Sequence, residues 1–240
     1  MSPSELEPVI QPLKAKTAES QDRSTAARLW YNLVQAVTQV YLIATGGLRA
    51  GGRHNIPKTG AALLVSNHLS YLDVFVIGIP LHRPLNYVAR STLFLPGLGA
   101  LIRSVGGFPI QREGMGASGL KETLKRLRRG GIVILFPEGT RSLDGQLGEL
   151  KSGIAVLASK AKVPIIPAAV AGTFEAWPRS QWLPLPSPVR IEYGAPIAPE
   201  DIRGLSTEVA TALIRRKMLE CQRLAIEGLK RDAGFVSDGD

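Results

Sequence analysis

The sequence predicts an α/β fold in which a mixed, largely parallel β-sheet is wrapped by helices. Along most of the chain, short apolar segments bounded by Gly, Pro, Asn or Ser alternate with longer segments of helical periodicity. Such alternation is typical of a sheet covered by helices. The chain has 240 residues, of which 45% are hydrophobic, and this is enough to bury the core of one large domain.

The N-terminal region differs in character from the rest of the chain. Residues 1–25 are rich in Ser, Pro, Glu, Lys and Gln and lack an apolar run, which predicts a disordered tail and no signal peptide. Residues 26–50 contain an uncharged stretch, Leu29–Leu48, that is long enough to span a bilayer. We therefore expect a membrane-associating helix here, on the cytoplasmic side of the membrane.

The polar residues of this helix favour a helix that lies in the membrane interface over one that crosses the bilayer. They recur at helical spacing along one side, at Arg28, Asn32, Gln35 and Gln39. A polar stripe beside a wide apolar face that carries Trp30 suits a helix lying in the membrane surface. The alternative is a helix packed on the globular domain.

Six later segments have the apolar or β-branched composition of strands. They are Ala61–Val65, Asn86–Val88, Val105–Ile110, Ile132–Phe136, Ile165–Val170 and Val189–Tyr193. Helices are predicted between and after them, namely one with Leu120, Leu124 and Leu127 as its apolar stripe, then Ile154–Lys162, then Thr207–Arg231. We therefore expect one domain over residues 51–232 and a flexible tail over 233–240.

The charge and the cysteine content narrow the class of protein. The formal net charge is +9, which predicts a polyanionic partner such as nucleic acid, an anionic membrane or a phosphorylated substrate. The single cysteine, Cys221, excludes an intrachain disulfide and fits a reducing compartment. Cys221 lies in the apolar stripe of the last predicted helix, so we interpret it as a core residue and not as a nucleophile.

A histidine and a carboxylate follow the first predicted strand of the domain. His68 comes directly after this strand, and Asp73 is close enough in the chain for a turn to bring its carboxylate to the imidazole. Asp73 would hold one ring nitrogen while the other takes a proton from a hydroxyl group. Two alternatives remain, because Ser70-x-x-Asp73 also fits a helix capping box and a lone histidine at a strand end is often a satisfied polar residue and not a base. His54 and His82 lack ligand-like spacing to His68, so no metal is expected.

Two further predicted strands end in arginine-containing segments. Arg112 follows one strand, and the run Phe136–Ser142 follows another and contains Arg141. If the strands are parallel neighbours, two guanidinium groups would meet at one sheet edge and could bind a phosphate, with Gly139 and Thr140 adding donors. Glu138 would repel a phosphate, so we expect it to accept a hydrogen bond from a substrate hydroxyl or to fix an arginine. The alternative is an ordinary exposed ion pair.

Taken in order, these segments resemble the bacterial 1-acyl-glycerol-3-phosphate acyltransferases, the PlsC-like family. The family's first motif, Asn-His-x-x-x-x-Asp, is matched by Asn67, His68 and Asp73. Its motif Phe-Pro-Glu-Gly-Thr-Arg-Ser is matched completely by Phe136–Ser142, and its apolar Val-Pro-Ile-x-Pro run by Val163–Pro167. Four ordered motifs, counting the partial one below, are far more specific than any one of them.

The remaining motif is matched only in part. In Gly-x-x-Phe-x-x-Arg, Gly106 and Arg112 agree, but Pro109 stands where Phe is usual. The family also favours a lysine after the second strand, where this chain has Arg90, which keeps the charge but not the shape of the side chain. The resemblance extends from about Gly52 to Pro196.

The resemblance implies a glycerolipid acyltransferase-like fold and a reaction. A fatty acyl group would pass from acyl-CoA or acyl carrier protein to the sn-2 hydroxyl of 1-acyl-glycerol-3-phosphate, without a metal or another cofactor. His68 would be the general base and Asp73 would orient it. The implied substrate-binding residues are Arg112, Glu138, Gly139, Thr140 and Arg141, with Asn67, Arg90 and Lys151 as secondary candidates. The protein would lie on the cytoplasmic face of the cell membrane as a peripheral or monotopic protein.

Two other functions stay open from the sequence. The acceptor could instead be glycerol-3-phosphate, a lyso-ornithine lipid or another lysophospholipid. A non-catalytic basic module that binds membrane or nucleic acid is a more remote alternative. Nucleic-acid binding is not expected, because the basic stretch Lys121–Arg129 contains no aromatic residue and aromatics are 6% of the chain.

Overall fold

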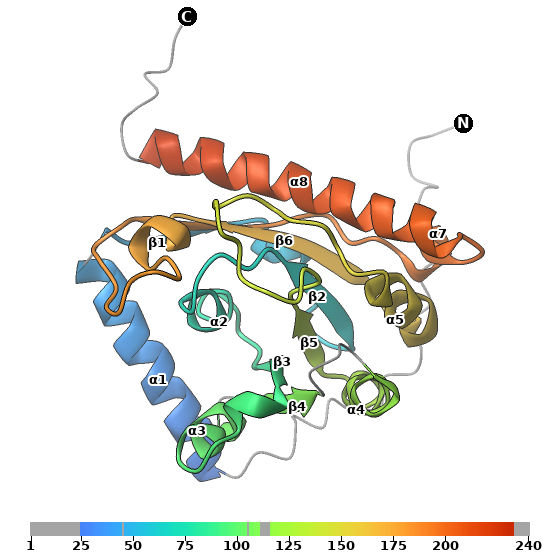
Figure 1. The fold of residues 1–240 in the computed structure, drawn as a ribbon, viewed down its shortest axis with the longest axis horizontal. Helices are drawn as coiled ribbons and strands as arrows, with labels where there is room; N and C mark the ends of the chain where they lie inside the picture. Colours follow the sequence, from blue (N-terminus) through green and yellow to red (C-terminus); the bar gives the residue numbers. More distant parts are fainter. Residues whose placement is uncertain (1–24, 45, 105, 111–115, 233–240) are drawn as a thin grey trace, which may run out of the picture.

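Seven strands form one sheet in the order β1-β7-β6-β2-β5-β3-β4 in the computed structural model, which describes residues 25–44, 46–104, 106–110 and 116–232 (Figure 1). Their bounds are β1 Leu48–Gly51, β2 Ala62–Ser66, β3 Leu85–Arg90, β4 Gly107–Ile110, β5 Ile132–Leu135, β6 Ile165–Ala171 and β7 Val189–Tyr193. Each of the six predicted strands is present, with its ends shifted by at most a few residues.

The pairing confirms a mixed, largely parallel sheet. Only β6 and β7 pair in antiparallel fashion, and every other neighbouring pair is parallel. The strands β2 to β6 therefore all end at the same edge of the sheet. Every residue of β2, β5 and β6 is buried, which explains why these strands read as continuous apolar runs and not as alternating ones.

Helices cover both faces of the sheet (Figure 1). Their bounds are α1 Thr25–Ala44, α2 Asp73–Val76, α3 Leu98–Ser104, α4 Ala117–Arg128, α5 Gly153–Ala161, α6 Thr173–Ala176, α7 Pro199–Ile202 and α8 Thr207–Asp232, with two 3₁₀ turns, η1 Arg53–Asn55 and η2 Ser91–Leu93. Alternate residues of β2 enter two separate cores. Leu64 packs in the core that includes residues of α1 and α2, and Leu63 packs in the core that includes α5 and α8.

The helix α1 combines the two arrangements that the sequence left open. One side packs on the domain, where Leu42 is buried and the Gln35 side-chain amide donates to the carbonyl of Gly78 at 3.0 Å. The packed-helix alternative is therefore correct for this side, and Gln35 does not belong to an outward polar stripe. The opposite side is apolar and exposed, at Leu29, Trp30, Leu33, Val37 and Val40.

The length and hydropathy of the helices bear on whether one of them could span a membrane. Within the ranges that the structure describes, no helix is both long enough and apolar enough to cross a bilayer.

The segment between α1 and β2 contains a strand that the sequence did not reveal. The predicted helix Leu29–Leu48 ends at Ala44, and Leu48 instead begins β1, which pairs with β7. Gly46 and Gly47 have φ values of 129° and 87°, which suit glycine and are incompatible with a continuing helix. The domain boundary expected between residues 50 and 51 thus falls inside β1. The predicted tails, 1–25 except for its last residue and 233–240, lie outside the described residues.

Cys221 is a core residue, as predicted. It is 2% exposed on α8, and burial raises the pKa of its thiol to about 12. A thiol with such a pKa stays protonated at neutral pH and is a poor nucleophile. Among the described residues, its thiol contacts the carbonyl of Pro167, and no contact joins it to His68.

Candidate active site

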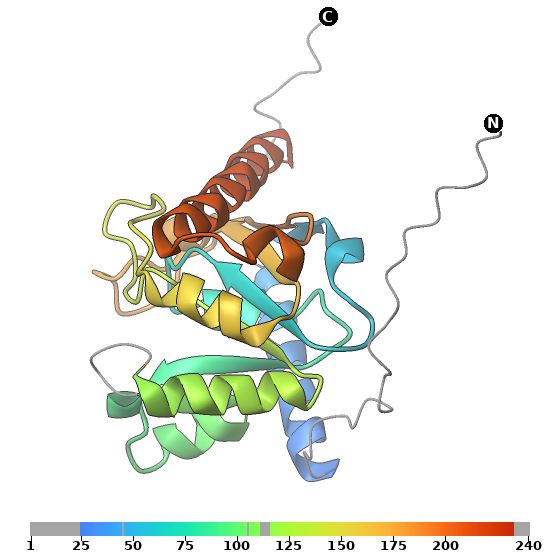
Figure 2. The same cartoon turned by 90° about the vertical axis from the view of Figure 1, so that its right-hand side faces the viewer.

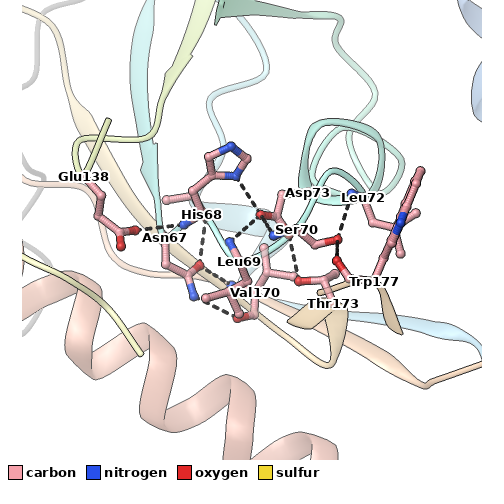
Figure 3. Close-up of polar contacts among 11 residues, drawn as sticks. Asn67, His68, Leu69, Ser70, Leu72, Asp73, Glu138, Val170, Thr173 and Trp177 are labelled. Atoms are coloured by element: carbon pink, nitrogen blue, oxygen red, sulfur yellow. Dashed lines mark hydrogen bonds and ion pairs between the residues drawn. The ribbon is translucent and has the colours of Figure 1, made fainter. Parts of the chain in front are cut away.

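The turn after β2 is fixed to the neighbouring strand β6 by Asn67. Its side-chain amide donates to the carbonyl of Val170 at 3.0 Å, and its carbonyl oxygen accepts from the Val170 N–H at 2.8 Å (Figure 3). Asn67 is 1% exposed, so these two bonds satisfy a buried polar group in the way a β-ladder would. The side-chain amide of Asn67, a secondary candidate for substrate binding, is therefore already hydrogen-bonded to the backbone of β6.

The fixed turn brings His68 and Asp73 together. The His68 Nδ1 lies 2.9 Å from the Asp73 Oδ2 (Figure 3). The aspartate is fully buried, whereas the imidazole keeps 20% of its side chain exposed. The predicted contact between these two residues is therefore present.

The buried carboxylate of Asp73 is held by four donors. Besides the imidazole, Oδ2 accepts the N–H groups of Leu69 at 2.7 Å and Ser70 at 2.8 Å. Oδ1 accepts the hydroxyl of Thr173, at the start of α6, at 2.7 Å. A buried charge without such partners would be strongly unfavourable, so these donors are what permits an ionised carboxylate at this position.

The capping box that the sequence left open is not formed. Asp73 is the first residue of α2, the N-cap is Leu72 without a side-chain cap bond, and Asp73 instead accepts the N–H of Ser70 in the preceding turn. The Ser70 hydroxyl makes different bonds, because it donates to the carbonyl of Trp177 at 2.8 Å and accepts the Leu72 N–H at 3.2 Å. Asp73 thus holds the turn before α2 and the imidazole with the same oxygen.

The loop after β5 holds His68 from the other side. The imidazole stacks on Phe136, with ring centroids 4.1 Å apart and an interplanar angle of 20°. The His68 carbonyl accepts the N–H of Ser142 at 2.7 Å. Within the described part of the chain, no group forms a hydrogen bond with His68 Nε2, and the residue lines a cavity. This nitrogen is therefore available to a bound substrate.

Glu138 has a different role from the one expected from the sequence. Its Oε1 accepts the N–H of His68 at 2.9 Å, and its Oε2 accepts the N–H of Gly148 at 3.0 Å. Burial raises the pKa of this carboxyl, while the two N–H donors act in the opposite direction. In place of a substrate hydroxyl or an arginine, Glu138 binds backbone and fixes the position of His68.

The cavity beside His68 has a volume of about 390 Å³, and its lining is of two chemical kinds. Cationic and hydroxyl side chains are contributed by Thr92, Thr140, Arg141, Lys151 and Arg179. Apolar side chains are contributed by residues that include Val74, Val88, Ala89, Leu93, Ile110, Leu135, Phe136 and Ile154. The same cavity can therefore accept an anionic group and a hydrocarbon chain.

Arg141 is held by an aromatic face and keeps a free donor. Its guanidinium carbon lies 3.6 Å from the centroid of the Tyr71 ring, and Tyr71 in turn contacts Trp177 at 5.6 Å between centroids. The Arg141 Nη1 is buried and has no hydrogen-bond partner among the described residues. Stacking fixes a guanidinium without using its N–H groups, which leaves them for an anion.

The other predicted binding residues are placed as follows. Gly139 adopts a φ of 71°, a left-handed conformation in which a side chain would be strained, so the loop favours glycine here. Thr140 and Lys151 both line the cavity. Arg90 ends β3, and its side chain is outside the described part. Arg112 also lies outside the described residues.

The sheet order corrects one premise about the arginine segments. The strands β4 and β5 end at the same edge, as expected, but β3 lies between them and pairs with both, so they are not neighbours. The sequence also missed Tyr71 and Arg179. Tyr71 lies inside the first motif at a variable position, and Arg179 is a single arginine in a proline-rich loop. Neither position carries a signal in one sequence.

The comparisons with known proteins agree with this site. The family model described as "Acyltransferase" matches residues 47–171, a range that includes His68, Asp73 and Arg141. The "1-acyl-sn-glycerol-3-phosphate acyltransferase" of Bacillus subtilis is 31% identical over 144 residues, which cover 59% of this chain and 71% of the relative. The chloroplastic "1-acyl-sn-glycerol-3-phosphate acyltransferase LPAT1" of Arabidopsis thaliana is 31% identical over 156 residues, or 63% of this chain and 42% of that longer relative.

A solved structure agrees with the fold. The crystal structure of the 1-acyl-sn-glycerophosphate acyltransferase PlsC from Thermotoga maritima matches with a TM-score of 0.67 and 26% identity over 83% of each chain. The predicted fold class is thus confirmed for the sheet and its helices. Sequence motifs, fold and the His68–Asp73 geometry lead to one conclusion, that this chain belongs to the acyltransferase family that includes the 1-acyl-sn-glycerol-3-phosphate acyltransferases.

Proposed function

We propose that this chain transfers a fatty acyl group from acyl-CoA or acyl carrier protein to the sn-2 hydroxyl of 1-acyl-glycerol-3-phosphate, forming phosphatidic acid. The observation that carries the proposal is the imidazole of His68, held by the buried Asp73 on one nitrogen and bordering a cavity with the other. The similar proteins described above are named 1-acyl-sn-glycerol-3-phosphate acyltransferases, and this supports the choice of acceptor.

The reaction needs one base and no enzyme nucleophile. His68 Nε2 takes the proton of the acceptor hydroxyl as the hydroxyl oxygen attacks the thioester carbonyl. The negative charge of Asp73 stabilises the imidazolium that forms. When the tetrahedral intermediate collapses, the carbon–sulfur bond breaks and the leaving thiolate takes the proton back from the imidazolium. General-base assistance of this kind supplies roughly 10²–10⁴-fold in rate, and positioning supplies more.

The two kinds of lining side chain suit the two parts of the acceptor. Arg141, with its unpartnered Nη1, can form charge-assisted hydrogen bonds with the phosphate, together with Thr140 and Lys151. We include Arg112 in this group on its motif position. The apolar lining residues can bury hydrocarbon, at about 0.8 kcal/mol for each buried CH₂ group. Glu138 and Asn67 act on the scaffold and not on the substrate.

Thiol release tests the proposed reaction directly. We expect palmitoyl-CoA to release free CoA in the presence of 1-acyl-glycerol-3-phosphate and not without an acceptor. Glycerol-3-phosphate, a lyso-ornithine lipid and a lysophospholipid with a larger headgroup serve as parallel acceptors. A preference for one of these compounds would show that it, and not 1-acyl-glycerol-3-phosphate, is the acceptor. An acyl group trapped on the protein would contradict direct attack by the acceptor hydroxyl on the thioester.

Arg141 provides a test of the phosphate contact. Arg141→Ala should raise the KM for the acceptor by about 10- to 150-fold, because a charge-assisted hydrogen bond contributes roughly 1.5–3 kcal/mol. The phosphate is remote from the reacting hydroxyl, so this contact is mostly uniform binding and kcat should fall less. Arg141→Lys should recover part of the affinity, since it keeps the charge but loses the stacked fork.

The donor substrate supplies the internal control for this variant. Steady-state kinetics with both substrates varied should show an unchanged KM for acyl-CoA. We expect the same pattern for Arg112→Ala. If the variants raise the KM for acyl-CoA alone, these arginines bind the phosphates of the carrier and the acceptor lies elsewhere.

We also propose that the exposed face of α1 lies in the surface of the cytoplasmic membrane leaflet. Its apolar side chains point away from the domain, and the acceptor and product are both lipids. Deleting residues 1–48 would remove the start of β1, so substitution is the better test. Leu33→Gln with Val37→Gln should weaken cosedimentation with vesicles while the melting temperature stays within about 2 °C, because both side chains are exposed. Vesicle binding equal to that of the unmodified chain would contradict the placement.

A further inference from the structure

Three loops that line the cavity also expose apolar side chains to solvent. Leu93 lines the cavity and Leu95 follows it, Arg141 lines the cavity and Leu143 follows it, and Arg179 lines the cavity shortly before Trp182 and Leu183. The exposed fractions are 61% for Leu95, 79% for Leu143, 95% for Trp182 and 77% for Leu183. We refer to Leu95, Leu143, Trp182 and Leu183 as the rim.

The rim lies on one side of the molecule because of the sheet topology. The loops follow β3, β5 and, after the short α6, β6, and these three strands run parallel and end at the same edge. Figure 2 shows the yellow loop after β5 and the orange loop after α6 projecting to the same side, on the left of the view. Isolated exposed apolar residues are common, but a set carried by three loops that also line one cavity marks an interaction surface.

We propose that the rim docks on an anionic lipid bilayer, with the cavity opening toward the lipid and with Trp182 and Leu183 inserted among the headgroups. This inference rests on the proposed function, because it explains how a lipid acceptor would enter the cavity. It is separate from the face of α1 and concerns residues that no sequence motif indicated.

The loop between α6 and β7 is built to present its tip. Residues 177–188 contain four prolines, which restrict the backbone, and Arg179 is their only charged residue. The Trp177 indole N–H donates to the carbonyl of Gln181 at 3.1 Å, and the Leu185 N–H donates to the carbonyl of Ala176 at 2.7 Å. These bonds close the base of the loop, so Trp182 stands out from the surface and does not fold back on it.

The chemistry of the rim favours lipid as its occupant. Tryptophan is enriched where membrane meets water, because its ring is apolar and its N–H is polar. Cationic side chains of Arg141, Lys151 and Arg179 line the same cavity, and the chain carries a net charge of +9. Basic groups near an anionic leaflet are attracted to it. An acidic carrier protein would lack a hydrocarbon layer for Trp182 and Leu183.

The end of this loop adjoins the region of α1. The Val189 N–H, directly after the loop, donates to the carbonyl of Gly47, which follows α1, at 3.0 Å. The loop is thus tied at one end to the chain segment that leads from α1 into the sheet.

The test replaces the two residues at the tip of this loop, Trp182 and Leu183. This tip variant is compared with a matched double variant on α8. Trp182→Ser with Leu183→Ser in the full chain should weaken cosedimentation with phosphatidylglycerol-containing vesicles by at least about tenfold, given 1.5–3 kcal/mol for each buried apolar side chain. Val209→Ser with Leu219→Ser, which alters two exposed apolar residues of α8 that do not line the cavity, should bind as the unmodified chain does. Binding is measured without substrates, so it does not depend on the proposed reaction.

Activity and fluorescence complete the test. The tip variant should lose acyl transfer to vesicle-embedded acceptor in proportion to binding, and keep transfer to acceptor in detergent micelles. Trp177 is kept, because its indole closes the base of the loop. In a Trp30→Phe chain, brominated lipid should quench the emission, and adding Trp182→Phe should remove the quenched component. Unchanged vesicle binding or no quenching would overturn the proposal. So would a loss of micellar activity seen with acyl carrier protein but not with acyl-CoA, which would assign the rim to the carrier protein.

Discussion

His68→Ala should lower kcat for acyl transfer by roughly 10²–10⁴-fold, because it removes the only base that the site places at the acceptor hydroxyl. Asp73 and Phe136 hold the imidazole in the cavity, and its second nitrogen has no described partner. The main-chain bonds at this position join the His68 N–H to Glu138 and the His68 carbonyl to Ser142, and alanine keeps both. The fold should therefore be kept, although the loss of one donor to the buried Asp73 should lower the melting temperature by a few degrees.

The control for this variant is a histidine outside the site. His54 lies in the turn η1 and is exposed, so His54→Ala should retain full activity. Thiol release with saturating acyl-CoA and acceptor, together with thermal unfolding of both variants, gives the comparison. If His68→Ala keeps more than about a tenth of the rate at a temperature where it is fully folded, His68 is not the general base.

The parts of the fold that the sequence predicted are those with a strong local signal. The strands β2, β5 and β6 are apolar along their whole length, and their buried position on both faces is the physical cause of that pattern. The strand β1 has no such signal, because its sequence Leu-Arg-Ala-Gly is short and only partly buried. It exists because β7 offers a partner edge, and a single sequence does not show this.

The contacts of the site also differ in whether a local sequence signal predicts them. The five-residue spacing from His68 to Asp73 is local, so a turn was a sound prediction. The partners of Glu138 are backbone groups of His68 and Gly148, and nothing in the side-chain pattern indicates a backbone partner. The stack of Arg141 on Tyr71 joins two loops that are far apart in the chain. Contacts of this kind are set by tertiary structure.

Asp73→Asn should lower the rate by roughly 10²–10³-fold and should also lower the melting temperature. From the sequence, the expected cause is the wrong imidazole tautomer. The structure gives a different cause. The N–H groups of Leu69 and Ser70 both point at Oδ2, so the asparagine should place its carbonyl oxygen there and still accept the imidazole N–H. What it lacks is the negative charge that stabilises the imidazolium, a contribution of roughly 4 kcal/mol for charges 4 Å apart near a protein surface.

The stability change follows from the same bonds. Hydrogen bonds to a carboxylate are about twice as strong as those to a neutral amide, so the helix start should lose roughly 1–2 kcal/mol. For a domain of this size that corresponds to a fall of about 2–8 °C in melting temperature. Thr173→Val is the matched control, because it removes the donor to Oδ1 and leaves the Oδ2–imidazole contact in place.

The two variants should differ in how rate and stability change together. Thr173→Val should lower the melting temperature by a similar amount but lower kcat by less than about tenfold, since the bond it removes is one of the four at the carboxylate and not the one to His68. Asp73→Asn should lower both. If Asp73→Asn lowers the melting temperature yet keeps the rate, Asp73 serves only to hold the turn before α2. The orientation of His68 must then come from its stack on Phe136 and its backbone bonds to the loop after β5.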